Sequence, residues 1–403
     1  MRRHGTVFNT DDTQDGALSF GIWEKGRNEM KILHIGDLHL DSAFSGFDKE
    51  GADKMRAMSR ECFQKTMDIA RERGVSLVLV AGDLFDTPFC TSATRKIVFD
   101  AISSVGCPVV ISPGNHDYYN KNGTYADKNL PENAYVFTSA ELGRFDFDEL
   151  GVTVIGYAFT SDRYEENPLS GDVPLSSDNV NILCAHTEIG VPLSKYAPMN
   201  MAAMARCGFT YAALGHIHAH TSPSRMGNTT AAYCGFAQGR SFDELGEGGA
   251  YIVDLDIESG AVELERIVVS DMRYEIIKLD ISTKNRDSDV IKMIEDEART
   301  KNFDKKVALR VVLVGAVPSD YSMDEKAIEN APELSFLALV KIKNKCVANF
   351  DLEYLKTDMT VRGEVYRSLL PMLESSDADE RKKASMALKF ALSALDKREI
   401  SVD

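Results

Sequence analysis

The sequence KILHIGDLHLD at residues 31–41 decides the fold class. Residues 31–35 are apolar enough to form a buried β-strand, and Gly36 follows at the point where the chain must turn. Asp37 and His39 come next, two positions apart. In an extended chain such side chains face the same side, so both could bind one metal ion. This stretch predicts a central strand that ends at a metal site.

Four more segments repeat the arrangement of an apolar strand followed by polar residues. Three of the strands are the runs at residues 77–81, 109–113 and 181–185, and helices are predicted between strands at 53–73 and 92–105. Continuously apolar strands that alternate with helices indicate a sheet covered on both faces, with its site at the carboxyl ends of the strands. The polar residues of these segments are Asp83, Asn115, His116, Asp117, His186, His216 and His218.

The ligand types narrow the chemistry of the predicted site. Carboxylates, an amide and imidazoles without any thiolate suit manganese, iron or zinc, and they differ from the thiolates of a structural zinc site. A single Asp-x-His or Gly-Asp pair is common and means little, so the prediction rests on five matches in order. We expect His34 to be a packed, hydrogen-bonded histidine, Cys184 to belong to the core, and His220 to lie in a loop.

Taken together, the five segments resemble those of calcineurin-like metallophosphoesterases. Three features are similar to SbcD-type DNA repair nuclease subunits, especially the YhaO-like branch: DLHLD at 37–41, GDLFD at 82–86, and YCGFAQGR at 233–240 followed by ELGEGG at 244–249. The resemblance is strong over residues 30–280. It implies an α/β fold, namely a metallophosphoesterase β-sandwich flanked by helices, with a smaller α/β capping domain and C-terminal helices.

The same resemblance implies a centre of two divalent metal ions, with manganese as the expected metal and iron or zinc as alternatives. Its ligands would be Asp37, His39 and His218 for one ion, Asn115, His186 and His216 for the other, and Asp83 as the bridge. Only two aspartates would offset four positive charges. The surplus would attract a phosphate and lower the pKa of a bound water, which gives a hydroxide for attack on phosphorus.

Other residues have supporting roles by resemblance. His116 would stabilise the transition state or protonate the leaving oxygen, and Asp117 would orient the ring of His116. Further candidates for a supporting or substrate-binding role are Asp41, Asp86, Arg225 and Arg240.

The amino-acid composition limits the cellular compartment and the substrate class of the protein. The odd number of seven cysteines argues for a reducing compartment, and no apolar run approaches the length of a membrane span, so a cytoplasmic protein, near the nucleoid when bound to DNA, is expected. The net charge of −16 opposes a nucleic-acid substrate, because Lys and Arg supply most backbone affinity. Metal ions and a partner protein would have to supply the positive charge that a nucleic-acid substrate requires.

Four segments are predicted: an N-terminal extension at 1–29, a nuclease domain at 30–272, a capping domain at 273–356, and a helical end at 357–403. The extension is expected to be disordered, or to precede a natural start at Met30. Expected elements in the remainder are a hairpin at 251–256 and 262–269, strands at 274–279, 307–317 and 347–355, and helices at 289–300, 324–341, 361–373 and 376–395. The last helix would begin at a capping box of Ser376 and Asp379 and carry the apolar stripes 386/390/394 and 387/391/395.

These features predict a manganese-dependent DNA nuclease, acting as the nuclease subunit of a complex with an SbcC-like or YhaN-like SMC-type ATPase. The predicted helices at 53–73 and 92–105 could also form a homodimer. One alternative is a phosphodiesterase or phosphatase for small nucleotides or phosphate esters, which the nuclease-like extensions and the cap argue against. A second is a non-catalytic scaffold, which the complete ligand set with His116 argues against.

Overall fold

A computed structural model describes residues 29–395 apart from 283, 319–320 and 350–351. The expectation for residues 1–29 therefore lies outside the described residues, except that Glu29 begins the first strand. The chain divides into two compact units, one ending at Tyr274 and one beginning at Glu275. No helix among the described residues is both long and apolar enough to cross a bilayer.

Two six-stranded sheets form the first unit. The first sheet has the order β14-β13-β1-β2-β3-β4, in which β1 to β4 are parallel and β13 and β14 extend it as an antiparallel hairpin. Its strands are β1 (Glu29–Ile35), β2 (Leu77–Val80), β3 (Val109–Ile111), β4 (Ala134–Val136), β13 (Gly249–Asp256) and β14 (Val262–Val268). The predicted strands and the predicted hairpin are confirmed.

The second sheet has the order β11-β12-β10-β7-β6-β5, again with four parallel strands in the centre and an antiparallel strand at each edge. Its strands are β5 (Gly143–Phe147), β6 (Val152–Gly156), β7 (Val180–His186), β10 (Tyr211–Gly215), β11 (Ser224–Met226) and β12 (Thr229–Tyr233). A small pair, β8 (Glu188–Ile189) and β9 (Pro198–Met199), and helix α3 (Met201–Met204) precede β10.

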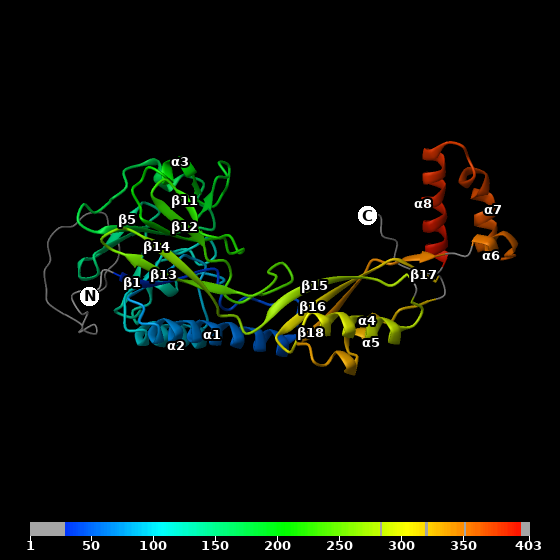
Figure 1. Cartoon of the computed structure of the whole chain (residues 1–403), viewed down its shortest axis with the longest axis horizontal. Helices are drawn as coiled ribbons and strands as arrows, with labels where there is room; N and C mark the ends of the chain where they lie inside the picture. The colour runs from blue at the N-terminus through cyan, green and yellow to red at the C-terminus, as the bar shows by residue number, and fades with distance from the viewer. Residues whose placement is uncertain (1–28, 283, 319–320, 350–351, 396–403) are drawn as a thin grey trace. The chain divides into compact units, whose positions relative to one another are not determined.

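The sheets pack face to face, as the prediction of a flanked β-sandwich requires (Figure 1). Alternate residues of β1 show why. Ile32 belongs to the core between the sheets, together with Leu79 of β2 and Ile182 of β7. Leu33 and Ile35 belong instead to the core under the helices. Both faces of β1 are therefore buried, which explains its continuously apolar sequence.

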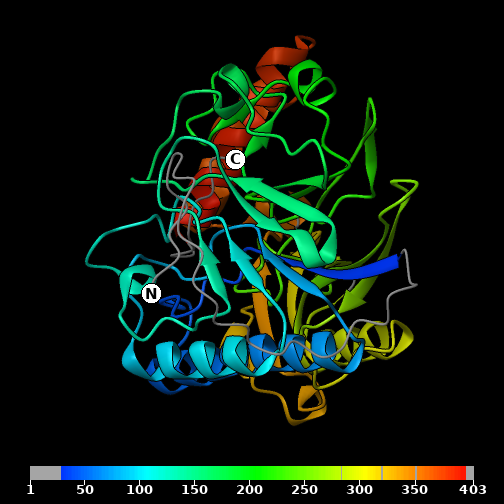
Figure 2. The same cartoon turned by 90° about the vertical axis from the view of Figure 1, so that its left-hand side faces the viewer.

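Two helices cover the outer face of the first sheet. They are α1 (Lys49–Glu72), capped by the side chain of Asp48, and α2 (Ser92–Ser104), capped by Thr91. Figure 2 shows them along one face of the unit, where Phe63 and Ile102 enter the core. Both helices confirm the predictions to within a few residues.

The second unit contains a three-stranded sheet of order β15-β16-β18 and a short pair, β17 with β19. The strands are β15 (Arg273–Asp280), β16 (Val307–Val314), β17 (Ala316–Pro318), β18 (Leu339–Asn344) and β19 (Val347–Asn349), and the helices are α4 (Asp287–Thr300) and α5 (Glu325–Glu329). The helix predicted at 324–341 is wrong in its second half, because residues 339–344 pair with β16.

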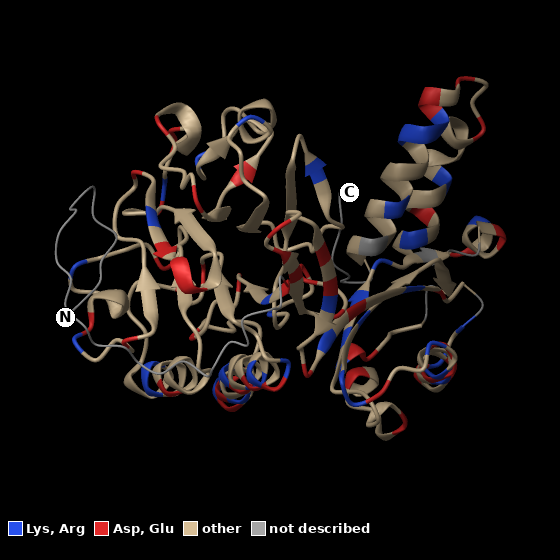
Figure 3. Ribbon diagram, turned by 60° about the vertical axis from the view of Figure 1, so that its left-hand side comes forward, with Lys and Arg blue, Asp and Glu red and all other residues tan. Residues whose placement is uncertain are grey.

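Three helices follow: α6 (Leu352–Thr357), α7 (Val361–Leu373) and α8 (Ala378–Leu395). The strand predicted at 347–355 is wrong from residue 352, where α6 begins. The capping box predicted at Ser376 is also wrong, because Asp377 caps α8: the carboxylate of Asp377 accepts from the N–H of Asp379, and its carbonyl oxygen accepts from the N–H of Arg381. Acidic residues lie in the first turn of α8 (Figure 3), which suits the helix dipole.

The two sheets of the first unit approach each other closely at Gly215, the last residue of β10. A Cβ atom there would lie 1.9 Å from the backbone oxygen of Ala81, which follows β2. We expect Gly215→Ala to lower the free energy of unfolding by about 3 kcal/mol, because backbone atoms must move apart. Gly171→Ala is the control, since a Cβ there meets nothing within 4 Å. Equal stability of the two variants in chemical denaturation would contradict the close approach.

Candidate metal centre

The residues predicted as ligands all follow the carboxyl ends of parallel strands. They come after β1, β2 and β3 of the first sheet and at the ends of β7 and β10 of the second. Asp37, His39, Asp83 and His186 are buried, whereas His216 and His218 are half-buried. The site is thus assembled from both sheets at one edge of the sandwich.

The first group of ligands surrounds Asp37. The Nε2 atoms of His39 and His218 lie 3.2 Å apart. His218 Nε2 lies 3.9 Å from the carboxylate of Asp37. One ligand atom from each of the three residues falls within 4.8 Å of the others, so the group could hold one ion.

The second group surrounds His186. Its Nε2 atom lies 3.0 Å from Asn115 Oδ1 and 3.3 Å from His216 Nδ1. Its Nδ1 atom is 3.0 Å from the carbonyl oxygen of Ala81, which accepts the Nδ1 proton. When the ring is neutral, this contact places the proton on Nδ1 and leaves the Nε2 lone pair directed into the site.

Asp83 lies between the two groups. Its Oδ2 atom is 3.3 Å from His186 Nε2 and 3.6 Å from His39 Nε2, and its Oδ1 atom accepts a hydrogen bond from the backbone of His116. The structure therefore brings all seven predicted ligand residues together, with Asp83 in the position that a bridging carboxylate needs.

The local backbone differs from the extended geometry predicted for Asp37-x-His39. Asp37, His39 and Asp83 have φ of 50°, 45° and 49°, and His216 has φ of 98°. Left-handed conformations of non-glycine residues are strained and concentrate at functional sites. The side chains converge through these turns and not through strand alternation, so that part of the reasoning is corrected.

Burial dominates the electrostatics of the cluster. It raises the pKa of Asp37 to about 6 and lowers the pKa of His39 to about 4 and that of His216 to about 3. Against the effect of burial, Asp83 and Asp37 raise the pKa of His186 to about 9, and His186 in turn keeps the pKa of Asp83 below its usual range.

These residues fit a pair of divalent cations. His39 faces His218 and His216 faces His186, each at hydrogen-bond distance, and ring nitrogens that face one another in this way repel unless a proton or a metal ion lies between them. The donors are nitrogen and oxygen atoms only. This donor set matches the ligands that manganese, iron and zinc accept.

Asp117 does not orient His116, and this expectation is corrected. Its carboxylate accepts hydrogen bonds from the backbone N–H groups of four residues and from the hydroxyl of Tyr125. The four residues are Asp83, Leu84, Phe85 and Gly114. Asp117 therefore fixes the loops that carry Asp83 and Asn115. The ring of His116 instead places Nδ1 3.3 Å from the carbonyl oxygen of Asp86.

Of the four other residues predicted to have supporting roles, two belong to the ligand cluster and two lie outside it. Asp86 and Arg240 join the cluster: Asp86 Oδ1 lies 3.3 Å from His39 Nδ1 and 3.5 Å from an Arg240 nitrogen. Asp41 binds the backbone of Thr91 at the start of α2. Arg225 is exposed on the edge strand β11, and no described contact joins it to the cluster.

The structure confirms the structural roles expected for His34 and Cys184. His34 is fully buried between the sheets, with Nδ1 2.8 Å from the hydroxyl of Tyr211 and Nε2 3.1 Å from the carbonyl oxygen of Leu214. Burial lowers the pKa of His34 to about 3, so the ring is neutral. Cys184 is buried in the core, and His220 is exposed.

Glu244 is the functional candidate that sequence reasoning missed. Its Oε1 atom lies 2.8 Å from His218 Nδ1. The same carboxylate accepts three contacts from the guanidinium of Arg240. The only signal in the sequence was its place in the nuclease-like segment at 244–249, where nothing marks it as a partner of a histidine.

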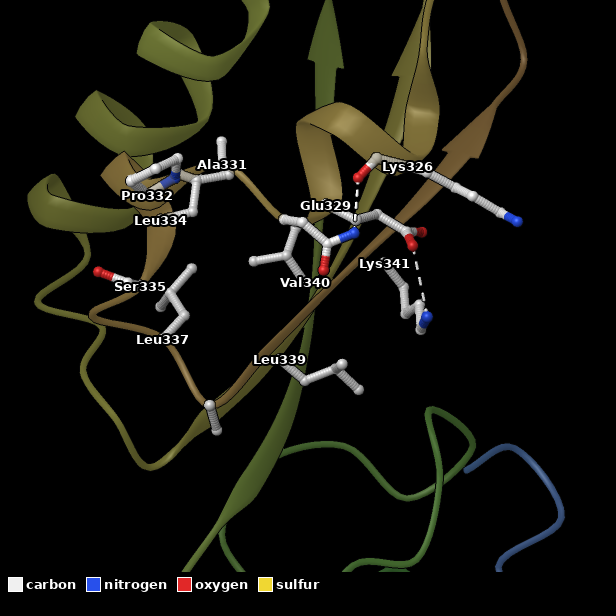
Figure 4. A pocket seen from close by; sticks show the side chains of 12 residues that line it. Lys326, Glu329, Ala331, Pro332, Leu334, Ser335, Leu337, Leu339, Val340 and Lys341 are labelled. Atoms are coloured by element: carbon white, nitrogen blue, oxygen red, sulfur yellow. Dashed lines mark hydrogen bonds and ion pairs between the residues drawn. The ribbon is translucent and has the colours of Figure 1, made fainter. Parts of the chain in front are cut away.

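A cavity of about 420 Å³ lies apart from this cluster, in the second unit beside α5 and β18 (Figure 4). Its one carboxylate, Glu329, already pairs with Lys341 and accepts from the backbone of Ile342. Its lining contains no histidine or cysteine. The cavity therefore lacks the chemistry of the metal cluster.

Comparison with known proteins agrees with this geometry. The family model described as calcineurin-like phosphoesterase matches residues 30–220. The metallophosphoesterase YhaO of Bacillus subtilis is 26% identical over 305 residues, which is 72% of this chain and 73% of YhaO. The DNA double-strand break repair protein Mre11 of Thermoplasma acidophilum is 24% identical over 75% of this chain and 83% of its own. Mre11 of Saccharolobus solfataricus is 23% identical over 71% and 75%.

The position of Asp83 between both ligand groups yields a prediction about metal content. Asp83→Asn should bind less than half of the manganese bound by the unaltered protein, because both ions lose a charged ligand. Elemental analysis after dialysis against manganese measures this loss. Asp100→Asn, on the exposed side of α2, is the control and should retain full metal content. Unchanged metal content in the Asp83 variant would refute the bridging position.

Proposed function

We propose that this protein is a manganese-dependent nuclease that hydrolyses phosphodiester bonds of DNA, since the family model described as calcineurin-like phosphoesterase matches residues 30–220. The observation that carries the proposal is the convergence of two ligand groups on Asp83. Two divalent ions held there would supply Lewis-acid chemistry, which neutralises a phosphate and activates water.

His116 is the residue that we assign to the leaving oxygen. It follows Asn115 directly, and its backbone N–H is anchored on Asp83, so the position of its ring is tied to the ligand cluster. The side chain is 46% exposed, and its ring lies edge to face against His39 at 4.6 Å. An exposed imidazole beside a buried cluster can reach a substrate and return its proton to water.

The choice of DNA draws on the relatives. The Mre11 proteins carry DNA double-strand break repair in their names, and one of them aligns over 340 residues, well beyond the phosphoesterase match.

We further propose that α8 docks on the coiled coil of an SMC-type ATPase of the SbcC-like or YhaN-like kind. The buried face of α8 consists of Ala384, Leu388 and Leu392, of which Leu388 and Leu392 share a core with Tyr366 of α7. The predicted stripe 386/390/394 lies on the other side of the helix. Met386 is 46% exposed there, so this stripe offers an apolar face to a second helix.

A nuclease in such a complex would act in the cytoplasm. The seven cysteines fit this proposal, since all are free thiols and four are buried. The alternative of a phosphodiesterase for small phosphate esters is favoured by one observation, the net charge of −16. Substrate comparison decides between them.

The substrate test uses single-stranded DNA, duplex DNA ends and an aryl phosphodiester, each with manganese. We expect cleavage of DNA. His116→Ala should lower the rate by about 100-fold or more while both metals remain, because general acid catalysis is lost and no ligand is removed. The control is His220→Ala, a change in an exposed histidine outside the cluster. Hydrolysis of the aryl ester alone would favour the small-substrate alternative, and no hydrolysis at all would favour a scaffold.

Docking of α8 is tested by binding to the isolated coiled coil of an SbcC-like or YhaN-like ATPase from the same genome. Met386→Glu should weaken binding by about 10-fold or more, since it places a charge in an apolar interface. Ser385→Glu adds the same charge outside the stripe and should have little effect. Equal binding of both variants, measured by calorimetry, would refute the proposed face.

A further inference from the structure

The two ligand groups are supported in different ways. In the second group, His186 is held by the backbone, because its Nδ1 donates to the carbonyl of Ala81. In the first group both histidines face carboxylates: His39 Nδ1 is 3.3 Å from Asp86 Oδ1, and His218 Nδ1 is 2.8 Å from Glu244 Oε1. Both histidines of the first group are therefore oriented by carboxylate side chains, whereas His186 of the second group is oriented by the backbone.

One arginine joins the two carboxylates. Arg240 Nε lies 3.0 Å from Glu244 Oε1, and Nη2 lies 2.5 Å from the same atom. Nη1 reaches Asp86 Oδ1 at 3.5 Å, and the backbone N–H of Arg240 donates to Glu244 Oε2 at 2.8 Å. Glu244 is buried, and only 20% of the Arg240 side chain is exposed. The planar guanidinium fork sets the spacing of both acids.

We propose that Arg240, through Asp86 and Glu244, is a positioning residue for one metal position only, the one formed by Asp37, His39 and His218. Glu244 holds His218 at Nδ1 and Asp86 faces Nδ1 of His39, so both carboxylates favour rings whose Nε2 atoms are directed at the same ion. We call Arg240, Asp86 and Glu244 together the clamp. The metal position formed by Asn115, His186 and His216 does not depend on it. This inference rests on the proposed two-metal site.

The geometry distinguishes this role from phosphate binding, the other role expected for Arg240. Its Nε, Nη1 and Nη2 atoms all contact carboxylates, and Nη2 is also 3.4 Å from His218 Nδ1. An arginine with these partners would have to release Glu244 to bind a phosphate. Because Glu244 also holds His218, that release would disturb a ligand.

The contact between His39 and Asp86 explains why the clamp is needed at the first metal position. His39 Nδ1 is fully buried and makes no hydrogen bond of good geometry, although Asp86 lies 3.3 Å away. A small displacement of Asp86 would leave this nitrogen without any acceptor. The Asp86 carboxylate is held by Arg240 and by the hydroxyl of Ser42 at 3.0 Å, and His116 Nδ1 lies 3.9 Å from it.

The test measures manganese binding to the full chain by calorimetry, with stoichiometry by elemental analysis. Arg240→Gln should weaken one of two sites by about 10- to 100-fold and leave the other unchanged, which is the usual effect of losing an outer partner of a metal ligand. Glu244→Gln keeps the size of the side chain and should weaken the same site. Arg225→Gln, on an exposed edge strand, is the matched control.

Additivity provides the second criterion. The variant that combines Arg240→Gln with Glu244→Gln should lose less manganese affinity than the sum of the two single losses, since both changes break the Arg240–Glu244 connection and only Arg240→Gln also releases Asp86. If Arg240→Gln does not fold, Arg240→Lys keeps the charge without the fork and should show the same selective loss. Thermal unfolding identifies which variants are folded.

Three outcomes would overturn the inference. Two unaltered sites in Arg240→Gln together with a raised KM for a phosphodiester would show that Arg240 binds phosphate. Equal weakening of both sites would show that the clamp is not selective. Additive losses in the combined variant would show separate roles. Failure of the unaltered protein to bind any manganese would instead refute the proposed two-metal function.

Discussion

The whole site depends on the contact between the two sheets at the ends of their central strands. At this edge the backbone of Gly215 meets the carbonyl oxygen of Ala81, and no side chain separates them. The same carbonyl accepts the Nδ1 proton of His186. The backbone N–H of His216 donates to both oxygens of Asp37, at 3.1 Å each. Residues from both sheets therefore occupy one small volume, which neither sheet could provide alone.

Bringing these ionisable side chains together away from water costs electrostatic free energy, which other interactions in the fold must offset. Asp37 and Asp83 are fully buried among histidines, and burial alone would neutralise such carboxylates. The surrounding backbone is fixed by another buried acid, Asp117, whose pKa burial raises to about 6. A sequence that kept three acids here only for stability would gain more from apolar residues. The arrangement is understandable if cations complete it.

The sequence predicted the strands and the order of the ligands because both leave local signals. An apolar run of strand length followed by glycine and a polar residue is visible without any partner. The left-handed turns at Asp37, His39 and Asp83 are not, since residues with side chains rarely adopt them and only the surrounding contacts enforce them. The segment after residue 349 was predicted as a strand for the related reason that its apolar residues fit either structure until tertiary contacts decide.

Roles of neighbouring acids were harder to predict than the ligands. Asp117 stands beside His116 in the sequence, but its carboxylate accepts from Tyr125 and from backbone N–H groups. Glu244 lies 26 residues after His218 and yet contacts its ring. Sequence adjacency is a poor guide here, because a supporting acid acts on whichever ring the tertiary fold brings to it.

The acidic character of the chain and the proposed DNA substrate can be reconciled by a division of roles. Buried acids such as Asp83 contribute to the net charge of −16 but are matched locally by the cations that they would bind. A phosphate therefore meets the local potential of the cluster and not the net charge of the protein. Affinity for a long duplex needs many basic contacts, and under the proposed docking of α8 the partner protein would carry them. On this reasoning an acidic nuclease subunit is the expected result when catalysis and DNA binding are assigned to different chains.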